Sequence, residues 1–329
     1  MENPLISVII PAYNAEETIE KCILSLLEQD YSNFEIVVIN DESTDQTNSI
    51  VQSMLNKHDC IRMYEIPHSG LAQVRNVGIK SSKGQFISFV DADDVVKSDY
   101  LSYLMNLLIT FNTDISSCQH SVIKINGDIH SNELAGFSRI YNSHDWFQKM
   151  LVRDHLDQTC WAKLYKKSIF DGIEFPPGKL FEDSATIYKT IMKSESIAVG
   201  SESKYDYILR NNSITTSSFN YGKLDLISAT ESMTEEIIRK YPDLYPEAML
   251  RLSWSHTSVL NNILLSGNDK ECNLLVNKLR EQILAHQKFI NSDLNPDRRL
   301  KLACFALKFG TKFYKNCLKM MVLKEQSGR

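Results

Sequence analysis

The clearest structural pattern in the chain is found in residues 5–45, LISVIIPAYNAEETIEKCILSLLEQDYSNFEIVVINDESTD. It opens with an apolar run at 5–10 and ends with a second apolar run at 35–40, both of strand length. Between them, residues 16–29 place apolar side chains three and four positions apart, which is the spacing of an amphipathic helix. The stretch therefore predicts a strand, a helix and a second strand in succession.

The same alternation continues along the chain. Helical spacing is found over 44–57 and 71–81, and strand-like runs over 61–66 and 85–90. These runs are apolar throughout rather than at every second position, as expected where both faces of a sheet are covered. Alternating strands and helices predict an α/β fold with a mostly parallel sheet covered by helices.

Further downstream the pattern loosens. A helix is predicted at 98–111, and then a strand at 114–125 that ends in an Asn-Gly-Asp turn of the hairpin type. The last third of the chain has helical periodicities and almost no strand signals. We therefore expect an α/β domain at 1–219 and a helical C-terminal region at 220–329.

The composition argues against several classes of protein. Of 329 residues, 43% are hydrophobic and 23% are charged, which is typical of a globular protein. No run approaches the roughly 18 apolar residues of a membrane span, and no secretory signal is visible. The net charge of −5 disfavours a nucleic-acid partner. Seven scattered cysteines without a CxxC pair argue against a disulfide framework or a zinc site, so we expect a cytoplasmic protein.

Polar residues follow three of the predicted strands: PAYN (11–14), NDES (40–43) and DADD (91–94). In parallel sheets, ligands bind beyond the carboxyl ends of the strands, where these segments would meet. Each alone is compatible with a turn or a helix cap, because Asn, Asp and Ser favour both. Three together, one of them with three carboxylates, favour a site for Mg²⁺ or Mn²⁺ and a diphosphate, because unneutralised carboxylates repel one another. Neither a P-loop nor a GxGxxG pattern is present.

The ordered motifs resemble those of family 2 glycosyltransferases. The resemblance is carried by residues 5–45, by GLAQVRNVGI and FVDADD, and by CWAKLYKKSIF (160–170) and FEDSATIY (181–188). It implies a GT-A fold, which is Rossmann-like, and an inverting enzyme of bacterial glycan assembly. A sugar-nucleotide pyrophosphorylase is disfavoured, because its first strand would be followed by a Gly-rich, Arg-containing loop.

The resemblance implies that Pro11, Tyr13 and Asn14 pack on the nucleoside, with the Tyr13 ring facing uracil. Asp41 matches a carboxylate that hydrogen-bonds the base. The usual motif here is DDGS, whereas this chain has NDES. Asp41 is retained, so base binding is expected, but Glu42 replaces the glycine of the turn.

Four further residues are expected near the donor. His68 matches a polar residue beside the base, with a solvated loop residue as the alternative. Arg75 matches an arginine that contacts the donor near the diphosphate, with a helix-surface ion pair as the alternative. Arg210 and Ser213 belong to YDYILRNNSITTS (205–217), which resembles a loop that closes over the diphosphate.

The acidic loop matches the DxD motif of the family. Asp91 would meet the ribose and the donor sugar, and Asp93 the Mg²⁺ or Mn²⁺ ion that bridges the two phosphates. Ala92, between them, would contact the donor. Asp94 would contact the sugar or support the metal ligands. Independently of the family, a cation stabilises the charge that develops on a departing diphosphate.

The Glu182-Asp183 pair resembles the family's ED motif, in which the aspartate is the general base. Asp183 is therefore the expected catalyst, and Glu182 would orient the site. The alternative is that both acids merely stabilise the first turn of a helix. Trp161 and Lys163 would line the acceptor pocket or its floor, or Trp161 would belong to the core.

These features predict an inverting, metal-dependent hexosyl- or N-acetylhexosaminyltransferase. It would move a sugar from a UDP-sugar to a hydroxyl of a glycan or lipid-linked acceptor. The alternative is a non-catalytic GT-A-like partner that binds a nucleotide or glycan; its DxD or base would be lost, and both are present. The sequence leaves open the donor sugar, the acceptor, the linkage and a homo-oligomeric state.

The C-terminal tail predicts a basic amphipathic helix over 296–324, begun by Asn295-Pro296-Asp297. On one continuous helix, five lysines would share an arc of about 60° opposite apolar side chains. Such a helix suits the anionic interface at the inner face of the cell membrane. The alternative is that its apolar face packs on other C-terminal helices or on a second subunit. The five lysines are Lys301, Lys308, Lys312, Lys315 and Lys319.

Overall fold

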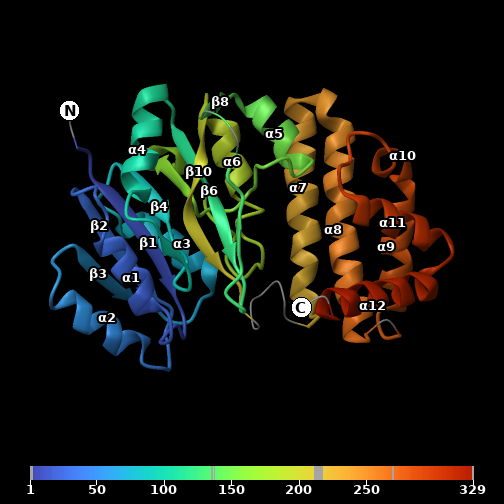
Figure 1. Ribbon diagram of the computed structural model, residues 1–329, viewed down its shortest axis with the longest axis horizontal. Helices are drawn as coiled ribbons and strands as arrows, with labels where there is room; N and C mark the ends of the chain where they lie inside the picture. The colour runs from blue at the N-terminus through green and yellow to red at the C-terminus, as the bar shows by residue number, and fades with distance from the viewer. Residues whose placement is uncertain (1–2, 135, 137, 211–217, 269, 328–329) are drawn as a thin grey trace. The chain divides into compact units, whose positions relative to one another are not determined.

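The computed structural model describes residues 3–134, 136, 138–210, 218–268 and 270–327, and shows two compact units. The first comprises Met1–Trp146 and Gln158–Ser213, and the second Phe147–Asp157 and Ile214–Arg329. Figure 1 shows strands in the first unit and helices in most of the second. The second unit thus takes a short segment, 147–157, from within the range that the sequence assigned to the α/β domain.

The first half of unit 1 confirms the predicted alternation of strands and helices. Four parallel strands lie in the order β3-β2-β1-β4. They are β1 (Ile6–Ala12), β2 (Phe34–Asn40), β3 (Ile61–Glu65) and β4 (Phe86–Phe89). The helices that connect them are α1 (Ile19–Leu27), α2 (Thr47–Leu55) and α3 (Leu71–Ser81).

The sheet continues beyond β4 with mixed directions, in the order β4-β9-β6-β10-β5. Strand β9 runs antiparallel to both β4 and β6, whereas β6 and β10 are parallel. The α/β fold is confirmed, with its parallel strands concentrated in the first half. The further elements are β5 (Val95–Val96), α4 (Tyr100–Phe111), β6 (Ile115–Ile123), β7 (Ile129–Ser131), β8 (Arg139–Tyr141), α5 (Ser143–Leu151), β9 (Lys163–Lys166), the 3-10 helix η1 (Lys167–Phe170), α6 (Ile187–Lys193) and β10 (Ile197–Ile208).

Strands β1 and β2 form the centre of the core and end at the same level of the sheet. Every residue of β1 is buried, and Ala12 at its end pairs with Asn40 at the end of β2. Helix α3 packs on both strands. A Cβ at position 78 of α3 would collide with the side chain of Ile9, so Gly78 permits this close approach. The aligned strand ends place the following loops side by side.

Unit 2 is helical, as the sequence predicts for the C-terminal region, and the described residues after Ile208 contain no strand. None of the described helices combines the length and the apolar character needed to cross a membrane. The elements are η2 (Tyr221–Leu224), α7 (Asp225–Lys240), η3 (Pro242–Leu244), α8 (Tyr245–Ser266), α9 (Asn273–Ala285), α10 (Gln287–Ile290), α11 (Arg298–Lys308) and α12 (Thr311–Ser327).

The single C-terminal helix expected over 296–324 is wrong in two respects. Helix α11 begins at Arg298, and its N-cap is Asp297, whose carboxylate accepts hydrogen bonds from the next turn. Asn295 instead accepts a bond from the backbone of Asp297 at 2.9 Å. The helix then ends before Gly310, whose φ of 101° is left-handed, and α12 starts afresh. The projection of five lysines onto one continuous helix therefore fails.

Candidate active site

The carboxyl ends of β1, β2 and β4 bring the three polar segments of the sequence to one edge of the sheet (Figure 1). Pro11 is the sixth residue of β1, is buried and pairs with Ile39 of β2. Tyr13 and Asn14 follow β1 directly, and Asp41 follows β2. The parallel register of these strands therefore creates the site from segments that lie about 30 residues or more apart.

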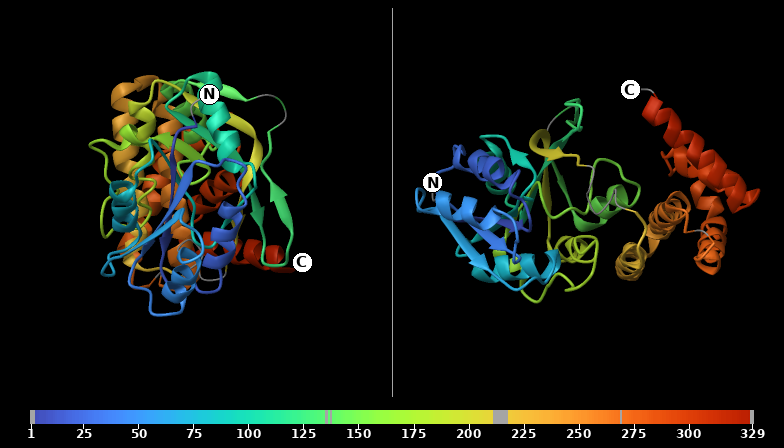
Figure 2. Two further views of the ribbon diagram at one scale, coloured as in Figure 1. Left: turned by 90° about the vertical axis from the view of Figure 1, so that its left-hand side faces the viewer. Right: turned by 90° about the horizontal axis from the view of Figure 1, so that it is seen from below.

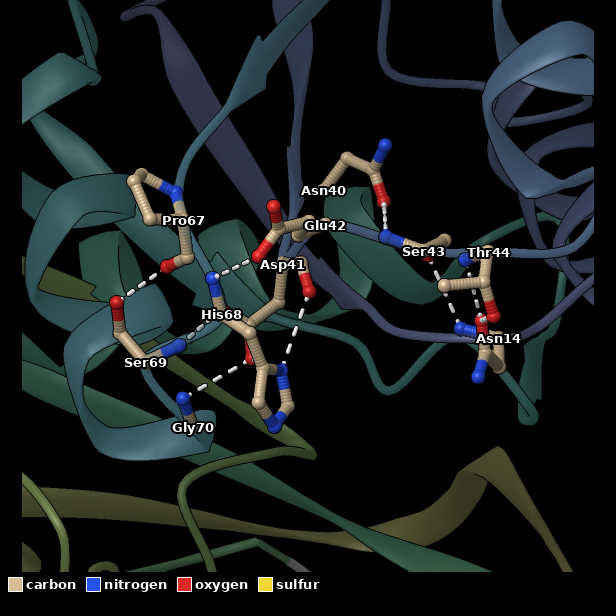
Figure 3. A network of polar contacts seen from close by, with 10 residues as sticks. All are labelled: Asn14, Asn40, Asp41, Glu42, Ser43, Thr44, Pro67, His68, Ser69 and Gly70. Carbon is tan, nitrogen blue, oxygen red and sulfur yellow. Dashed lines mark hydrogen bonds and ion pairs between the residues drawn. The ribbon is translucent and has the colours of Figure 1, made fainter.

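Asp41 is buried and holds the loop that precedes α3 (Figure 3). Its Oδ1 accepts a hydrogen bond from the Ser69 backbone N–H at 2.8 Å, and its Oδ2 one from Gly70 at 3.0 Å. The Nδ1 atom of His68 lies 3.0 Å from the same Oδ2. The structure thus brings Asp41 and His68 into direct contact.

The rings of Tyr13 and His68 pack against each other beside the hydrogen-bond network of Asp41. Their centroids are 4.4 Å apart and their planes are tilted by 32°. Half of Tyr13 is exposed, so the pair presents an aromatic surface to solvent. Such a surface can stack against another planar ring.

The turn after β2 keeps a left-handed backbone at the position where the family has glycine. Glu42 has a φ of 56°, and its Oε2 accepts a hydrogen bond from the His68 backbone N–H at 3.0 Å. Beside it, Asn14 Oδ1 accepts from the Thr44 backbone at 2.8 Å, and the Asn14 N–H donates to Ser43 Oγ at 3.0 Å (Figure 3). Glycine would adopt this turn without strain. Glu42 instead supplies a contact that glycine lacks.

The loop after β4 gathers three carboxylates. Asp94 is buried and accepts hydrogen bonds from the Tyr205 hydroxyl at 2.7 Å and from the Ile208 backbone at 2.9 Å. Burial and the neighbouring charges of Asp91 and Asp93 raise the pKa of Asp94 to about 8. Burial and Asp91 also raise the pKa of Asp93. The loop is therefore an environment that favours added positive charge.

Arg75 on α3 joins this loop to the segment before α6. It is almost completely buried, and its two terminal nitrogens bond to Glu182 and, at 3.1 Å, to Asp91. Burial by itself would lower the pKa of Arg75, but the neighbouring Cys160, Glu182 and Asp91 raise this pKa well above its usual range, so Arg75 stays protonated. The helix-surface ion pair considered as an alternative is excluded by this burial.

Asp183 lies next to Glu182, three residues before Thr186, which is the N-cap of α6. Its Oδ1 accepts a hydrogen bond from the Ser184 backbone at 2.7 Å. Burial and then the charge of Glu182 raise the pKa of Asp183 to about 7. A carboxylate with this pKa can accept a proton efficiently near neutral pH.

The chain is similar to known proteins in sequence and in fold. The family model for glycosyl transferase family 2 matches residues 7–173, about half of the chain. The chain belongs to glycosyl transferase family 2.

Several bacterial proteins are similar to this chain. Glycosyltransferase GlyA of Streptococcus pneumoniae is 30% identical over 217 residues, which cover 64% of this chain and 31% of GlyA. The chain thus spans about a third of that relative's length. The structure of S. aureus TarS 1–349 in complex with UDP-GlcNAc covers 97% of this chain and 92% of its own, with a TM-score of 0.65 and 21% identity.

A second solved structure shares the fold. It is the mannosyltransferase PcManGT from Pyrobaculum calidifontis in complex with GDP-Man and Mn²⁺, with a TM-score of 0.55 and 17% identity. It covers 98% of this chain and 88% of its own. Together with TarS, it identifies the fold of unit 1 as the GT-A fold of family 2 enzymes.

Two predicted residues of the segment CWAKLYKKSIF (160–170) are buried inside unit 1. Trp161 is buried and stacks on Tyr205, with centroids 4.7 Å apart, and on Tyr207, at 5.6 Å. Lys163 is also buried, and its Nζ donates to Thr159 Oγ1 at 3.2 Å. This packing agrees with the core interpretation of Trp161.

Two of the remaining predicted residues, Ala92 and Arg210, lie in or beside the acidic loop. Ala92 is buried between the two aspartates of the DxD motif. The Nε atom of Arg210 lies 3.6 Å from Asp93 Oδ2. Ser213 lies outside the described residues. The structure therefore brings Arg210 close to the acidic loop, and its expected contact with the diphosphate stays a prediction.

Sequence reasoning missed Tyr205. Its hydroxyl donates to Asp94 and accepts a hydrogen bond from the Asp91 backbone at 3.2 Å. We interpreted residues 205–208 as part of a loop, whereas they end strand β10. The alternation of Tyr205 and Tyr207 was the available signal, because side chains two apart share one face of a strand.

Proposed function

We propose that the chain is an inverting glycosyltransferase that moves a sugar from a UDP-sugar to a hydroxyl of a glycan or lipid-linked glycan. We assign the reaction to residues 1–219. The observation that carries the proposal is the position of Arg75, which bonds to Asp91 of the DxD motif and to Glu182 beside Asp183. The buried Arg75 guanidinium thereby links the acidic loop to the segment that carries the proposed base, Asp183.

The proposed binding of the UDP-sugar is based on Asp41 and on the paired rings of Tyr13 and His68. The Tyr13 and His68 rings offer a face for uracil, and Asp41 fixes the loop that carries His68. TarS, which shares the fold, was solved in complex with UDP-GlcNAc, and this supports a UDP-sugar here. We include UDP-hexoses and UDP-N-acetylhexosamines as donors.

The carboxylates of the acidic loop are suitable ligands for a divalent cation. Among the described residues, no group of three or more His, Cys, Asp or Glu side chains is arranged to hold a metal. Mg²⁺ and Mn²⁺ need only one or two carboxylates when substrate phosphates complete their coordination. Asp93, with Asp91, would hold the ion. When bound, it would stabilise the charge on the departing diphosphate, and the complex of PcManGT with Mn²⁺ supports this choice of ion.

Asp183 is the proposed general base. As the acceptor oxygen bonds to the anomeric carbon, the bond from that carbon to the diphosphate oxygen breaks, and the acceptor proton passes to the Asp183 carboxylate. The electron pair leaves with UDP, and the configuration inverts in this single displacement. Burial and then the charge of Glu182 raise the pKa of Asp183, and Glu182 is itself held by Arg75.

The test is a donor screen on the full chain. UDP release is measured with UDP-Glc, UDP-Gal and their N-acetyl forms, with Mg²⁺ or Mn²⁺ and with EDTA, in the presence of glycan acceptors. The proposal predicts metal-dependent UDP release from at least one donor and a product of inverted anomeric configuration. A product of retained configuration would overturn the inverting mechanism. Full activity in EDTA would overturn the dependence on a metal. Tight UDP binding without any transfer would favour the non-catalytic alternative.

A further inference from the structure

Helices α11 and α12 carry a row of exposed apolar side chains, which we call the aromatic ridge. It consists of Leu302, Phe305, Phe309, Phe313 and Met320, each between 48% and 64% exposed. The two helices form the red end of the chain in Figure 2. An exposed apolar row of this kind marks an interaction site more often than an isolated surface residue does.

The ridge is continuous across the break between the two helices. The ring centroids of Phe305 and Phe309 are 5.3 Å apart, and those of Phe309 and Phe313 are 5.5 Å apart. Leu302 extends the row, because it lies three positions before Phe305 on α11. Met320 lies seven positions after Phe313, two turns further along the same face of α12. The turn at Gly310 therefore aligns the outer faces of two helices instead of interrupting them.

The opposite faces of the same helices are packed within unit 2. Leu300 and Leu307 of α11 and Leu318 of α12 are buried. The Tyr314 hydroxyl donates to Asn261 Oδ1 of α8 at 2.6 Å, and Arg280 Nε of α9 donates to the Leu307 carbonyl at 2.8 Å. The apolar residues that the sequence placed on one face are thus divided. One set holds the helices in place, and the other forms the ridge.

Basic residues alternate in the sequence with those of the ridge. Residues 298–322 contain seven Lys or Arg residues and no Asp or Glu, in a chain whose net charge is −5. Lys308 and Lys312 flank Phe309 in the sequence, and Lys319 precedes Met320; all three are exposed. The excess of positive charge is therefore local to the helices that carry the ridge.

We propose that the aromatic ridge and its lysines form a binding surface for an anionic membrane. Aromatic and aliphatic side chains on one face would enter the boundary between headgroups and acyl chains, while the lysines meet anionic headgroups. A second copy of the chain is a poorer occupant, because two such surfaces would bring their lysines together and repel. An anionic lipid surface complements both the charge and the apolar row.

The experiment measures sedimentation of the full chain with vesicles of phosphatidylcholine alone or mixed equally with phosphatidylglycerol. The intact chain should bind the anionic vesicles and be released at high salt, because salt screens exposed charges. Phe309→Ser with Phe313→Ser should weaken binding by about tenfold or more, since both rings lose their burial in lipid. Ile125→Ser with Ile129→Ser, at exposed positions of the β6–β7 hairpin, is the matched control and should bind as the intact chain does.

A charge series separates the electrostatic contribution. Lys308→Gln, Lys312→Gln and Lys319→Gln should each weaken binding to anionic vesicles by about fivefold. Three exposed lysines of unit 1, changed as Lys21→Gln, Lys57→Gln and Lys83→Gln, serve as controls and should have no effect.

Three results would overturn the proposal. One is that the intact chain does not bind anionic vesicles at low salt, and another is that the hairpin control weakens binding as much as the ridge variant. The third is a concentration-dependent dimer that the ridge variant abolishes, which would assign the surface to a second copy. Phe305→Ser with Met320→Ser repeats the test if the first pair unfolds. UDP release by the ridge variants tests the proposed activity separately.

Discussion

Arg75 and Glu182 are 107 positions apart in the sequence and form a buried ion pair. Arg75 uses its other terminal nitrogen to bond Asp91 at 3.1 Å. The acidic donor loop and the segment that carries Asp183 are therefore coupled through one side chain. Changes at Arg75 should affect folding and catalysis together.

Arg75→Met should lower the free energy of unfolding by about 3–5 kcal/mol, because it leaves two carboxylates without their buried cation. Urea denaturation measures this loss. Combining it with Glu182→Gln should cost less than the sum of the single changes, because the second change removes one orphaned charge. Additive effects would show that the two residues are not coupled.

Asp183→Asn should reduce kcat by about 10²–10⁴-fold, because it removes the proton acceptor and keeps the shape of the side chain. UDP affinity, measured by calorimetry, should change little. The exposed Asp171 provides a control, since Asp171→Asn leaves the site untouched. Loss of UDP binding in the Asp183 variant would indicate a structural role instead.

The dependence of kcat/KM on pH should reflect the titration of Asp183. Its pKa is raised to about 7, so the active, deprotonated form is lost as the pH falls below that value. We expect kcat/KM to fall about tenfold per pH unit on the acidic side. Burial is the main cause of the raised pKa of Asp183, and the charge of Glu182 adds to it. Glu182→Gln removes that charge, so the acidic limb should move to lower pH. An unchanged limb in that variant would assign the titration to another group.

Asp93→Ala should abolish turnover and the dependence of UDP affinity on Mg²⁺ or Mn²⁺. Without metal, the variant should be as stable as the parent or more stable, because one of three mutually repelling carboxylates is gone. Thermal unfolding with EDTA measures the stability. Full activity in this variant would refute the assignment of Asp93 as a metal ligand.

Glu42→Gly should act in opposite directions on stability and on binding. Glycine relieves the left-handed backbone, a gain of about 1 kcal/mol, but loses the carboxylate that accepts the His68 N–H. We therefore expect equal or higher thermal stability with weaker UDP binding. Glu42→Gln keeps an acceptor oxygen and should retain the affinity, so equal losses in both variants would argue against this role.

Much of the fold could be predicted because its signals are local. The runs at 5–10 and 35–40 became β1 and β2, and the helix expected at 71–81 is α3. The polar segments after the strands could also be located, because parallel strand ends share one edge of a sheet. Short periodic patterns were sufficient for these features.

Other features depend on contacts that no local pattern encodes. The position of Arg75 between Asp91 and Glu182 requires segments about a hundred residues apart to meet. Tyr205 reaches Asp94 because β10 pairs with β6 and β5, and this long-range pairing could not be read from the sequence. In the tail, apolar periodicity was read through Gly310, although a single left-handed residue ends the helix there.

The stacking of Trp161 on Tyr205 and Tyr207 gives the molecule an optical reporter. Light absorbed by either tyrosine reaches the indole efficiently, because the ring centroids are only 4.7 and 5.6 Å away. Tyr205 is in turn hydrogen-bonded to Asp94 of the acidic loop. A charge entering that loop would polarise the phenol and shift the emission of Trp161, so occupancy could be followed by fluorescence without a label.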